Sequence, residues 1–117
     1  MGVSGGPNII RDSSLVLELD AADRNSYPGS GTTWRDLTAN NNTGSLTNGP
    51  TFSSANLGSI VFDGSNDYAL INSGSTSINP TSAITLASFF NITSYTQNFA
   101  PIIFKQNNYT SYFEQYS

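Results

Sequence analysis

Aspartates gather in two turn-rich stretches of the chain and are the first candidates for chemistry. Calcium prefers several oxygen ligands from flexible loops, and carboxylates placed in turns can supply them. The candidate ligands are Asp20, Asp23, Asp63 and Asp67. Aspartates in such turns also accept hydrogen bonds from nearby backbone amides, and the spacing fits no EF-hand loop. Turn chemistry therefore accounts for these residues better than calcium does, and no cofactor is expected.

Glu18 and Asp20 form a second candidate, a carboxylate pair that could cleave a glycosidic bond. Residues two apart on a strand lie on the same face, and glycoside hydrolysis needs two carboxylates about 5–10 Å apart across a sugar cleft. The only other glutamate is Glu114, and the residues that follow the pair supply no third partner carboxylate. The chain also has no histidine, which excludes serine–histidine catalysis. We expect no enzyme activity and no catalytic residue.

Three aromatic residues, Tyr27, Trp34 and Tyr68, are candidates for carbohydrate binding. Aromatic faces stack on the apolar faces of sugar rings, and tyrosine and tryptophan add a polar group. Trp34 is the only tryptophan, and burying so large a ring stabilises a fold strongly. For Trp34 the sequence therefore favours a core anchor over a ligand platform.

Composition limits the function further. The chain has 117 residues, enough for one domain, and only 10% of them are charged. The net charge is −4 with four basic residues, too few for a patch that follows phosphates. Neither nucleic acid nor a membrane surface is an expected partner. Cysteine is absent, so the fold uses no disulfide.

The elements that must position these side chains are predicted to be strands. Apolar, β-branched and aromatic runs alternate with clusters of turn formers, and no segment has the caps of a helix. The expected strands are Leu15–Asp20, Thr33–Leu37, Gly44–Leu46, Ser59–Phe62, Tyr68–Ile71, Ile84–Ile92, Pro101–Lys105 and Tyr109–Tyr116. The Asp63-Gly64 turn predicts that Tyr68–Ile71 is the hairpin partner of Ser59–Phe62. The loop region 24–58 is unusually long, so it is expected either to be functional or to be held down by anchors such as Tyr27, Trp34 and Phe52.

Four stretches of the sequence resemble the concanavalin A-like lectin/glucanase superfamily. They are LVLELDAAD (15–23), SYPGSGTTWRDLT (26–38), NNNTGSLTNGPTF (40–52) and SIVFDGSNDYALI (59–71). The closest similarity is to the laminin-G-like jelly-roll modules of bacteriophage virion proteins, and Ile84–Ile92 matches a further family strand more loosely. The resemblance implies an all-β, antiparallel jelly-roll sandwich. It also implies a non-enzymatic role in capsid decoration, a fibre or tail attachment.

The chain supplies fewer strands than this family normally has. We therefore expect an extended N-terminal arm over 1–14 and a partial sandwich over 15–117. A partner, or a continuation of the chain, would complete that sandwich. A partial sandwich could not cover all the aromatic residues near the end of the chain, and exposed apolar surface normally marks an interface. The expected interface residues are Ile9, Ile10, Phe104, Tyr112, Phe113 and Tyr116.

The leading hypothesis is a non-enzymatic structural protein located in the virion. Its expected partners are capsid, tail or fibre subunits, further copies of itself and host surface glycans, and the arm is the first candidate for docking onto the particle. The alternative is a carbohydrate-binding, lectin-like module of a surface or secreted protein. The fold hosts both functions, so the residues alone do not separate them.

Overall fold

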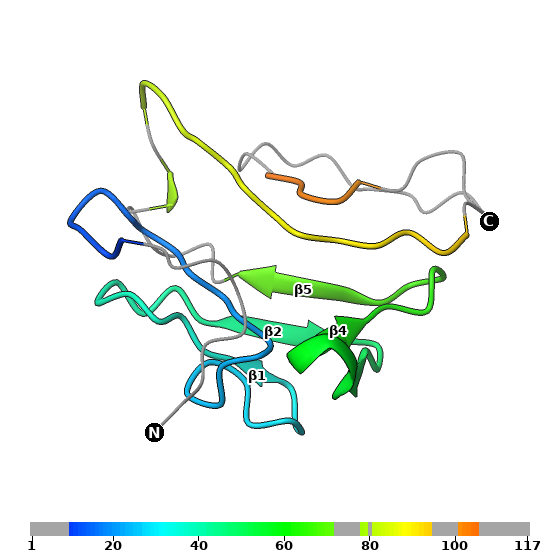
Figure 1. The fold of residues 1–117 in the computed structure, drawn as a ribbon. Helices are drawn as coiled ribbons and strands as arrows, with labels where there is room; N and C mark the ends of the chain where they lie inside the picture. Colours follow the sequence, from blue (N-terminus) through cyan, green and yellow to red (C-terminus); the bar gives the residue numbers. More distant parts are fainter. Residues whose placement is uncertain (1–9, 72–77, 80, 95–100, 106–117) are drawn as a thin grey trace.

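Two small antiparallel sheets form the framework of the chain (Figure 1). The computed structural model describes residues 10–71, 78–79, 81–94 and 101–105. Within them the elements are β1 (Thr33–Trp34), β2 (Gly44–Thr47), β3 (Thr51–Ser53), the short 3₁₀ turn η1 (Ala55–Leu57), β4 (Ser59–Val61) and β5 (Tyr68–Ile71). The described part has no α-helix, and so none that could cross a membrane. The expectation of an antiparallel all-β chain is confirmed.

The larger sheet has the order β1-β2-β5 and buries one face. Trp34, Gly44 and Ile71 are cross-strand partners, so they share that face, and the buried Leu46 lies on the same side of β2. Gly44 leaves room there for two neighbouring side chains. A Cβ on it would lie 3.1 Å from Cδ1 of Ile71 and 3.5 Å from Cδ1 of Leu19. The segment before β1 thus packs onto the inner face of the sheet.

The opposite face of this sheet is open. Thr33, Ser45 and Leu70 form one cross-strand row on it, and Tyr68 lies beside Leu70 on β5. Leu70 is 57% exposed and Tyr68 is nearly half exposed. An apolar residue so placed on a strand is normally covered by another layer.

The core joins the second sheet, β3-β4, to the loop that precedes β1. The Tyr27 side chain is only 2% exposed, and its ring lies 5.6 Å from the ring of Phe52 on β3, tilted by 41°. The Tyr27 hydroxyl donates a hydrogen bond to the carbonyl of Gly31 at 2.8 Å. This confirms the predicted anchoring of the loop region by Tyr27 and Phe52.

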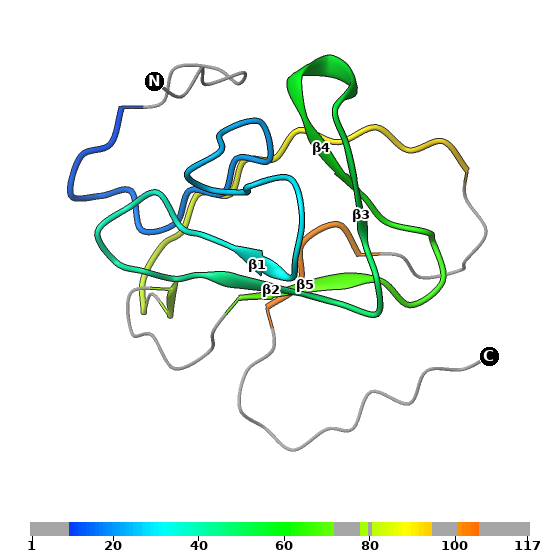
Figure 2. The same cartoon turned by 90° about the horizontal axis from the view of Figure 1, so that it is seen from below.

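Strand pairing differs from the predicted hairpin. β4 pairs with β3, which the sequence analysis did not predict, and β5 pairs with β2 (Figure 2). Asn48 and Gly49, with φ of 68° and 107°, turn the chain from β2 into β3 in the other sheet. Asn48 Nδ2 then donates to the carbonyl of Asn66 at 2.7 Å, in the loop that returns the chain to β5. The Asp63-Gly64 turn therefore connects the two sheets, and the predicted hairpin between Ser59–Phe62 and Tyr68–Ile71 is wrong.

The predicted strand Leu15–Asp20 is also wrong, for a physical reason. The segment has no strand partner in the described structure, because side chains take the hydrogen bonds that a neighbouring strand would make. The amide of Glu18 donates to Asp36 at 2.9 Å, and Asn42 Nδ2 donates to the carbonyl of Val16 at 2.6 Å. The predicted strand Thr33–Leu37 is shortened to β1, because the Leu37 amide turns away to the carbonyl of Glu18.

The C-terminal strands are not formed in the part that the structure describes. Ile84–Ile92 and Pro101–Lys105 belong to neither sheet, and residues 81–94 follow a long extended path (Figures 1 and 2). The predicted strand Tyr109–Tyr116 lies outside the described residues. A jelly-roll sandwich needs more strands than these two sheets provide.

We predict that Gly58→Ala destabilises the fold strongly. Gly58 has φ of 136°, and a Cβ there would lie 2.8 Å from the carbonyl oxygen of Ala21 and 3.0 Å from Cα of Ala22. Both are backbone atoms, so the clash and the strained φ should together cost about 3 kcal/mol of unfolding free energy. Urea unfolding followed by tryptophan fluorescence measures this loss.

Gly31→Ala is the matched control. Gly31 also has a positive φ, of 87°, but beyond its chain neighbours no atom of the described residues lies within 4 Å of the position that a Cβ would take. This substitution should cost only the backbone strain, about 1 kcal/mol. Equal losses for the two variants would contradict the close approach of Gly58 to the Ala21–Ala22 turn.

Candidate functional site

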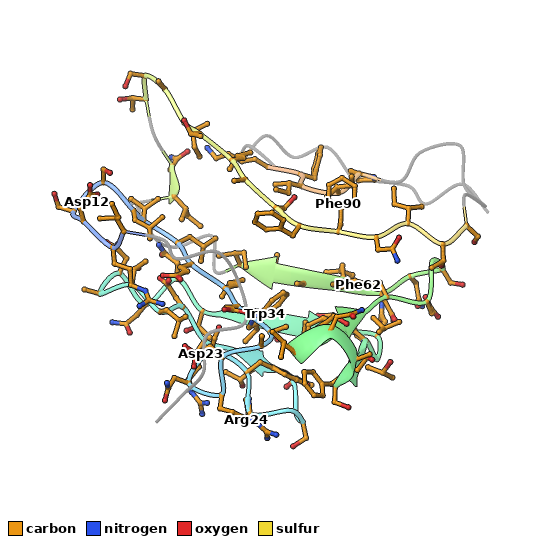
Figure 3. The ribbon with its side chains drawn as sticks, in the orientation of Figure 1. Asp12, Asp23, Arg24, Trp34, Phe62 and Phe90 are labelled. Atoms are coloured by element: carbon orange, nitrogen blue, oxygen red, sulfur yellow. The ribbon has the colours of Figure 1, made fainter. Side chains whose placement is uncertain are left out.

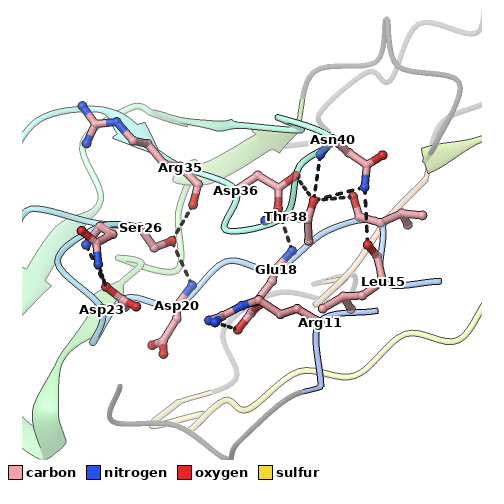
Figure 4. Close-up of polar contacts among 12 residues, drawn as sticks. Arg11, Leu15, Glu18, Asp20, Asp23, Ser26, Arg35, Asp36, Thr38 and Asn40 are labelled. Atoms are coloured by element: carbon pink, nitrogen blue, oxygen red, sulfur yellow. Dashed lines mark hydrogen bonds and ion pairs between the residues drawn. The ribbon is translucent and has the colours of Figure 1, made fainter. Parts of the chain in front are cut away.

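The buried carboxylate of Asp36 is the centre of the polar network in this structure (Figure 4). Its Oδ1 accepts hydrogen bonds from the amides of Glu18 and Thr38, at 2.9 Å and 3.0 Å. Its Oδ2 accepts from the amide of Asn42 at 2.8 Å and from the Thr38 hydroxyl at 2.7 Å. One side chain therefore holds the segment before the acidic turn, the end of β1 and the loop that leads into β2.

The surroundings of Asp36 keep its carboxylate charged. Burial raises the pKa, and it is the largest single influence, but the hydrogen bonds from Glu18, Thr38 and Asn42 together outweigh it. The pKa of Asp36 therefore lies below its ordinary value. A carboxylate with four donors has little capacity left for a ligand, so its role is structural.

Ser26 makes a second buried bridge between the acidic turn and β1. Its hydroxyl donates to the carbonyl of Arg35 at 2.6 Å and accepts from the amide of Asp20 at 3.1 Å. Its own backbone carbonyl accepts from the Arg35 amide at 2.8 Å, and its amide donates to the carbonyl of Asp23 at 2.9 Å. Ser26 is fully buried, so it too is part of the framework.

The first pair of candidate calcium ligands caps its own turn. Asp20 Oδ1 accepts from the amide of Ala22 at 2.9 Å. Asp23 is buried, and its Oδ1 accepts from both the amide and the side-chain Nδ2 of Asn25, at 2.8 Å and 3.0 Å. These are the side chain-to-backbone bonds expected from turn chemistry.

The second pair lies in the turn between β4 and β5. Asp63 Oδ1 accepts from the amide of Ser65 at 2.8 Å, and Asp67 Oδ2 accepts from the amide of Asp63 at 3.0 Å. Asp67 Oδ1 is buried without a hydrogen-bond partner among the described residues, but one oxygen is far from a calcium coordination sphere. Nowhere in the described ranges are three or more acidic side chains grouped so that they could hold a metal ion.

The candidate carboxylate pair is divided between different partners. Glu18 is buried and forms an ion pair with Arg11, whose Nη2 donates to Glu18 Oε1 at 2.9 Å. This hydrogen bond and the charge of Glu18 raise the pKa of Arg11. The Asp20 carboxylate accepts from Ala22 in the neighbouring turn instead. The common strand face on which the glycosidase hypothesis depended is not formed.

The three candidate sugar-binding rings lie in three different environments, and Figure 3 shows the position of Trp34. Tyr27 is a core residue, so its ring has no free face for a sugar, and the prediction of a binding role does not fit its burial. Trp34 is half-buried on the inner face of the larger sheet, where its Nε1 has no hydrogen-bond partner among the described residues. Tyr68 alone of the three stands on the open face, so the structure does not bring them together as one platform.

The predicted interface residues are only partly described. Ile9, Tyr112, Phe113 and Tyr116 lie outside the described residues. Ile10 is 82% exposed and Phe104 is about half exposed. Ile10 lies just before Arg11, so the last part of the predicted arm is joined to the body through the ion pair with Glu18.

Sequence reasoning did not include the most exposed apolar segment among the interface residues. Every described residue from 81 to 94 is exposed, and Phe89 and Phe90 are 84% and 59% exposed. Figure 3 shows the position of Phe90. We call residues 84–92 the apolar segment. A signal for it exists in the sequence, because no charged residue lies between Asp67 and Lys105. A stretch without charge that is also exposed differs from an ordinary solvated surface.

A hollow of about 410 Å³ lies between residues 11–15 and the loop 37–40. Its polar side chains already have partners within the chain. Arg11 binds Glu18, Asp12 Oδ1 accepts from Ser14, and Asn40 Nδ2 donates to the carbonyl of Leu15 at 3.4 Å. The hollow therefore offers few groups that could converge on a ligand.

We predict that Asp36→Asn lowers the free energy of unfolding by about 2–4 kcal/mol, because an amide group would face backbone donors with a donor of its own. Asp12→Asn is the control. Asp12 is exposed, and its carboxylate accepts hydrogen bonds from Ser14 in its own turn, so this change should cost much less. Urea unfolding at neutral pH measures both, and equal losses would contradict the central role of Asp36.

The wild-type protein and the Asp36→Asn variant should also differ in how their stability depends on pH. The stabilisation from a carboxylate with a lowered pKa is complete above the unfolded-state value and is lost as the pH falls through the folded-state value. The wild-type protein should therefore lose stability as the pH falls below about 4, and Asp36→Asn should lose less over the same range. Parallel curves for the two proteins would contradict this account.

Comparison with known proteins adds no identification. No protein-family model matches the chain, and neither the curated proteins nor the solved structures contain a significant match. The resemblance to the concanavalin A-like superfamily therefore stays a prediction from the sequence.

Proposed function

We propose that this chain is a non-enzymatic structural protein of a bacteriophage virion, which acts through contacts with other proteins in capsid decoration, a fibre or tail attachment. One observation carries the proposal: large apolar side chains are exposed along a stretch without charge. Those at least half exposed are Leu70, Ile84, Leu86, Phe89, Phe90, Ile102 and Phe104. Exposed apolar surface of this extent is typical of a protein interface.

The structural role of the acidic residues supports the same proposal. Asp36, Asp23 and Glu18 are buried, and their carboxylates bind backbone amides or Arg11. They stabilise a loop-rich framework, which can present a surface to a partner. The sequence resemblance to laminin-G-like modules of virion proteins supports a particle as the setting.

We also propose that a partner completes the sandwich. β1, β2 and β5 bury one face of their sheet and leave Tyr68 and Leu70 exposed on the other. We place further strands of a jelly-roll sandwich in residues 84–92 and 101–105, which would form strands when a partner supplies the missing pairing. Strand edges and apolar faces are commonly completed between chains in this way.

Protein contact is favoured over the alternative of glycan binding. A sugar platform needs exposed aromatic faces together with polar groups, and of the three candidate rings only Tyr68 stands on the open sheet face. The apolar segment contains isoleucine, leucine and phenylalanine, which suit a protein partner better than a sugar.

The test is the composition of virus particles from cultures that produce the chain. After density-gradient purification, quantitative mass spectrometry should find the wild-type chain at a fixed copy number relative to the major capsid protein. Phe90→Asp should reduce its occupancy at least tenfold, because a charge is then placed on the contact surface. Ser30→Asp, which adds the same charge to an exposed loop, should leave occupancy unchanged.

Two results would contradict the proposal in different ways. Absence of the wild-type chain from purified particles would remove the virion assignment. Full occupancy of the Phe90→Asp variant would show that the contact surface lies elsewhere. Circular dichroism of both variants checks that the framework is still folded.

A further inference from the structure

The apolar segment is an extended chain without a sheet. In the described structure residues 81–94 have no strand partner, and every one of them is exposed. Backbone amides and carbonyls of an extended segment are ready to pair with another strand. The even-numbered apolar residues, Ile84, Leu86, Phe90 and Ile92, would share one face of such a strand, because side chains alternate along it.

β5 offers a place for a further strand. It is the last strand of the order β1-β2-β5, and among the described residues no strand pairs with its outer side. Leu70 and Tyr68 are exposed on the open face beside that edge. A strand added there would bring its own apolar row next to Leu70, and such cross-strand pairs stabilise a sheet.

The distribution of charge favours a second copy of this chain as the partner. Each copy carries a net charge of −4, so most approaches between two copies are repulsive. The stretch from Tyr68 to Phe104 contains no charged residue, and it includes both β5 and the apolar segment. Two copies that meet there avoid repulsion between like charges at the contact.

The presence of both an unpaired segment and an unpaired edge in each copy also favours a second copy as the partner. Among its described residues each copy contains the unpaired apolar segment and the unpaired outer edge of β5, so reciprocal exchange between two copies pairs both of them. A reciprocal contact of this kind closes with two-fold symmetry, the commonest arrangement of soluble oligomers. A one-way contact would instead continue into a fibre.

We infer that residues 84–92 of one copy pair with the outer edge of β5 in a second copy, and that the exchange is reciprocal. This inference rests on the proposed function, because it names the first partner of the same contact surface. The dimer would join two β1-β2-β5 sheets, each extended by a strand from the other copy.

Engineered disulfides test this arrangement directly, because the chain contains no cysteine. Leu70→Cys marks the β5 edge, and Ile84→Cys, Leu86→Cys and Phe90→Cys mark three registers of the segment. A disulfide forms only when the two Cα atoms lie about 4–7 Å apart. One single-cysteine variant carries a mass tag, is mixed with an untagged partner variant, and the mixture is oxidised and analysed by mass spectrometry.

The expected result is a mixed disulfide between Leu70→Cys and at least one segment variant, at about twice the chain mass of 12.5 kDa. Sedimentation of the wild-type protein should show a dimer. Leu86→Lys should shift it to the monomer and Ser30→Lys should not, since Leu86 and Ser30 are both exposed in the single chain.

Three results would overturn the inference. The first is a wild-type chain that sediments as a monomer at every concentration. The second is a disulfide that forms only within a chain carrying Leu70→Cys and Leu86→Cys together. The third is cross-linking of Leu70→Cys solely with itself, which would mean that two β5 edges meet. A monomer found in purified particles would contradict this inference and leave the proposed function standing, whereas a dimer absent from particles would do the reverse.

Discussion

The hydrogen bonds to the Asp36 carboxylate are the constraint on which the rest of the structure depends. They join the amide of Glu18 to those of Thr38 and Asn42, which both lie in the connection between β1 and β2. Buried backbone groups must find partners, and here a side chain supplies what a neighbouring strand would normally supply. The geometry of the acidic turn, the end of β1 and the entry into β2 all follow from this one charged group. The chain therefore gains a stable framework with very few strand residues.

Two parts of the chain differ in how far their polar and apolar groups are paired and covered. Residues 15–71 satisfy most of their buried polar groups within the same stretch and bury Tyr27, Leu46 and Phe52 at least in part. The apolar segment, residues 84–92, has the composition of a strand but neither a ladder nor cover in the described structure. Extended apolar segments of this kind are normally paired and covered by a partner. The proposed role in assembly and the proposed exchange between copies would each supply such a partner.

Local patterns predicted β2, β4 and β5, because each is bounded by strong turn formers such as Asn48-Gly49 and Asp63-Gly64. The pairing of β5 with β2 could not be predicted, since it depends on a crossing between sheets held by Asn48 and Asn66, 18 positions apart. β3 is only three residues long and has little pattern of its own. Leu15–Asp20 has the pattern of a strand, but its backbone forms hydrogen bonds with the side chains of Asp36 and Asn42 where a strand would pair with a neighbouring strand. The aspartate turns were predicted correctly because their bonds are local, whereas the central role of Asp36 also depends on Glu18, 18 positions away in the sequence.

Hydrogen exchange of the full chain at a series of protein concentrations tests the division most directly. The amides of Glu18, Thr38 and Asn42 should be protected at every concentration, because their acceptor lies within the same chain. The amides of residues 84–92 should exchange rapidly in dilute solution and become protected as the concentration rises. Equal protection of residues 84–92 at all concentrations, or rapid exchange at all of them, would contradict the account.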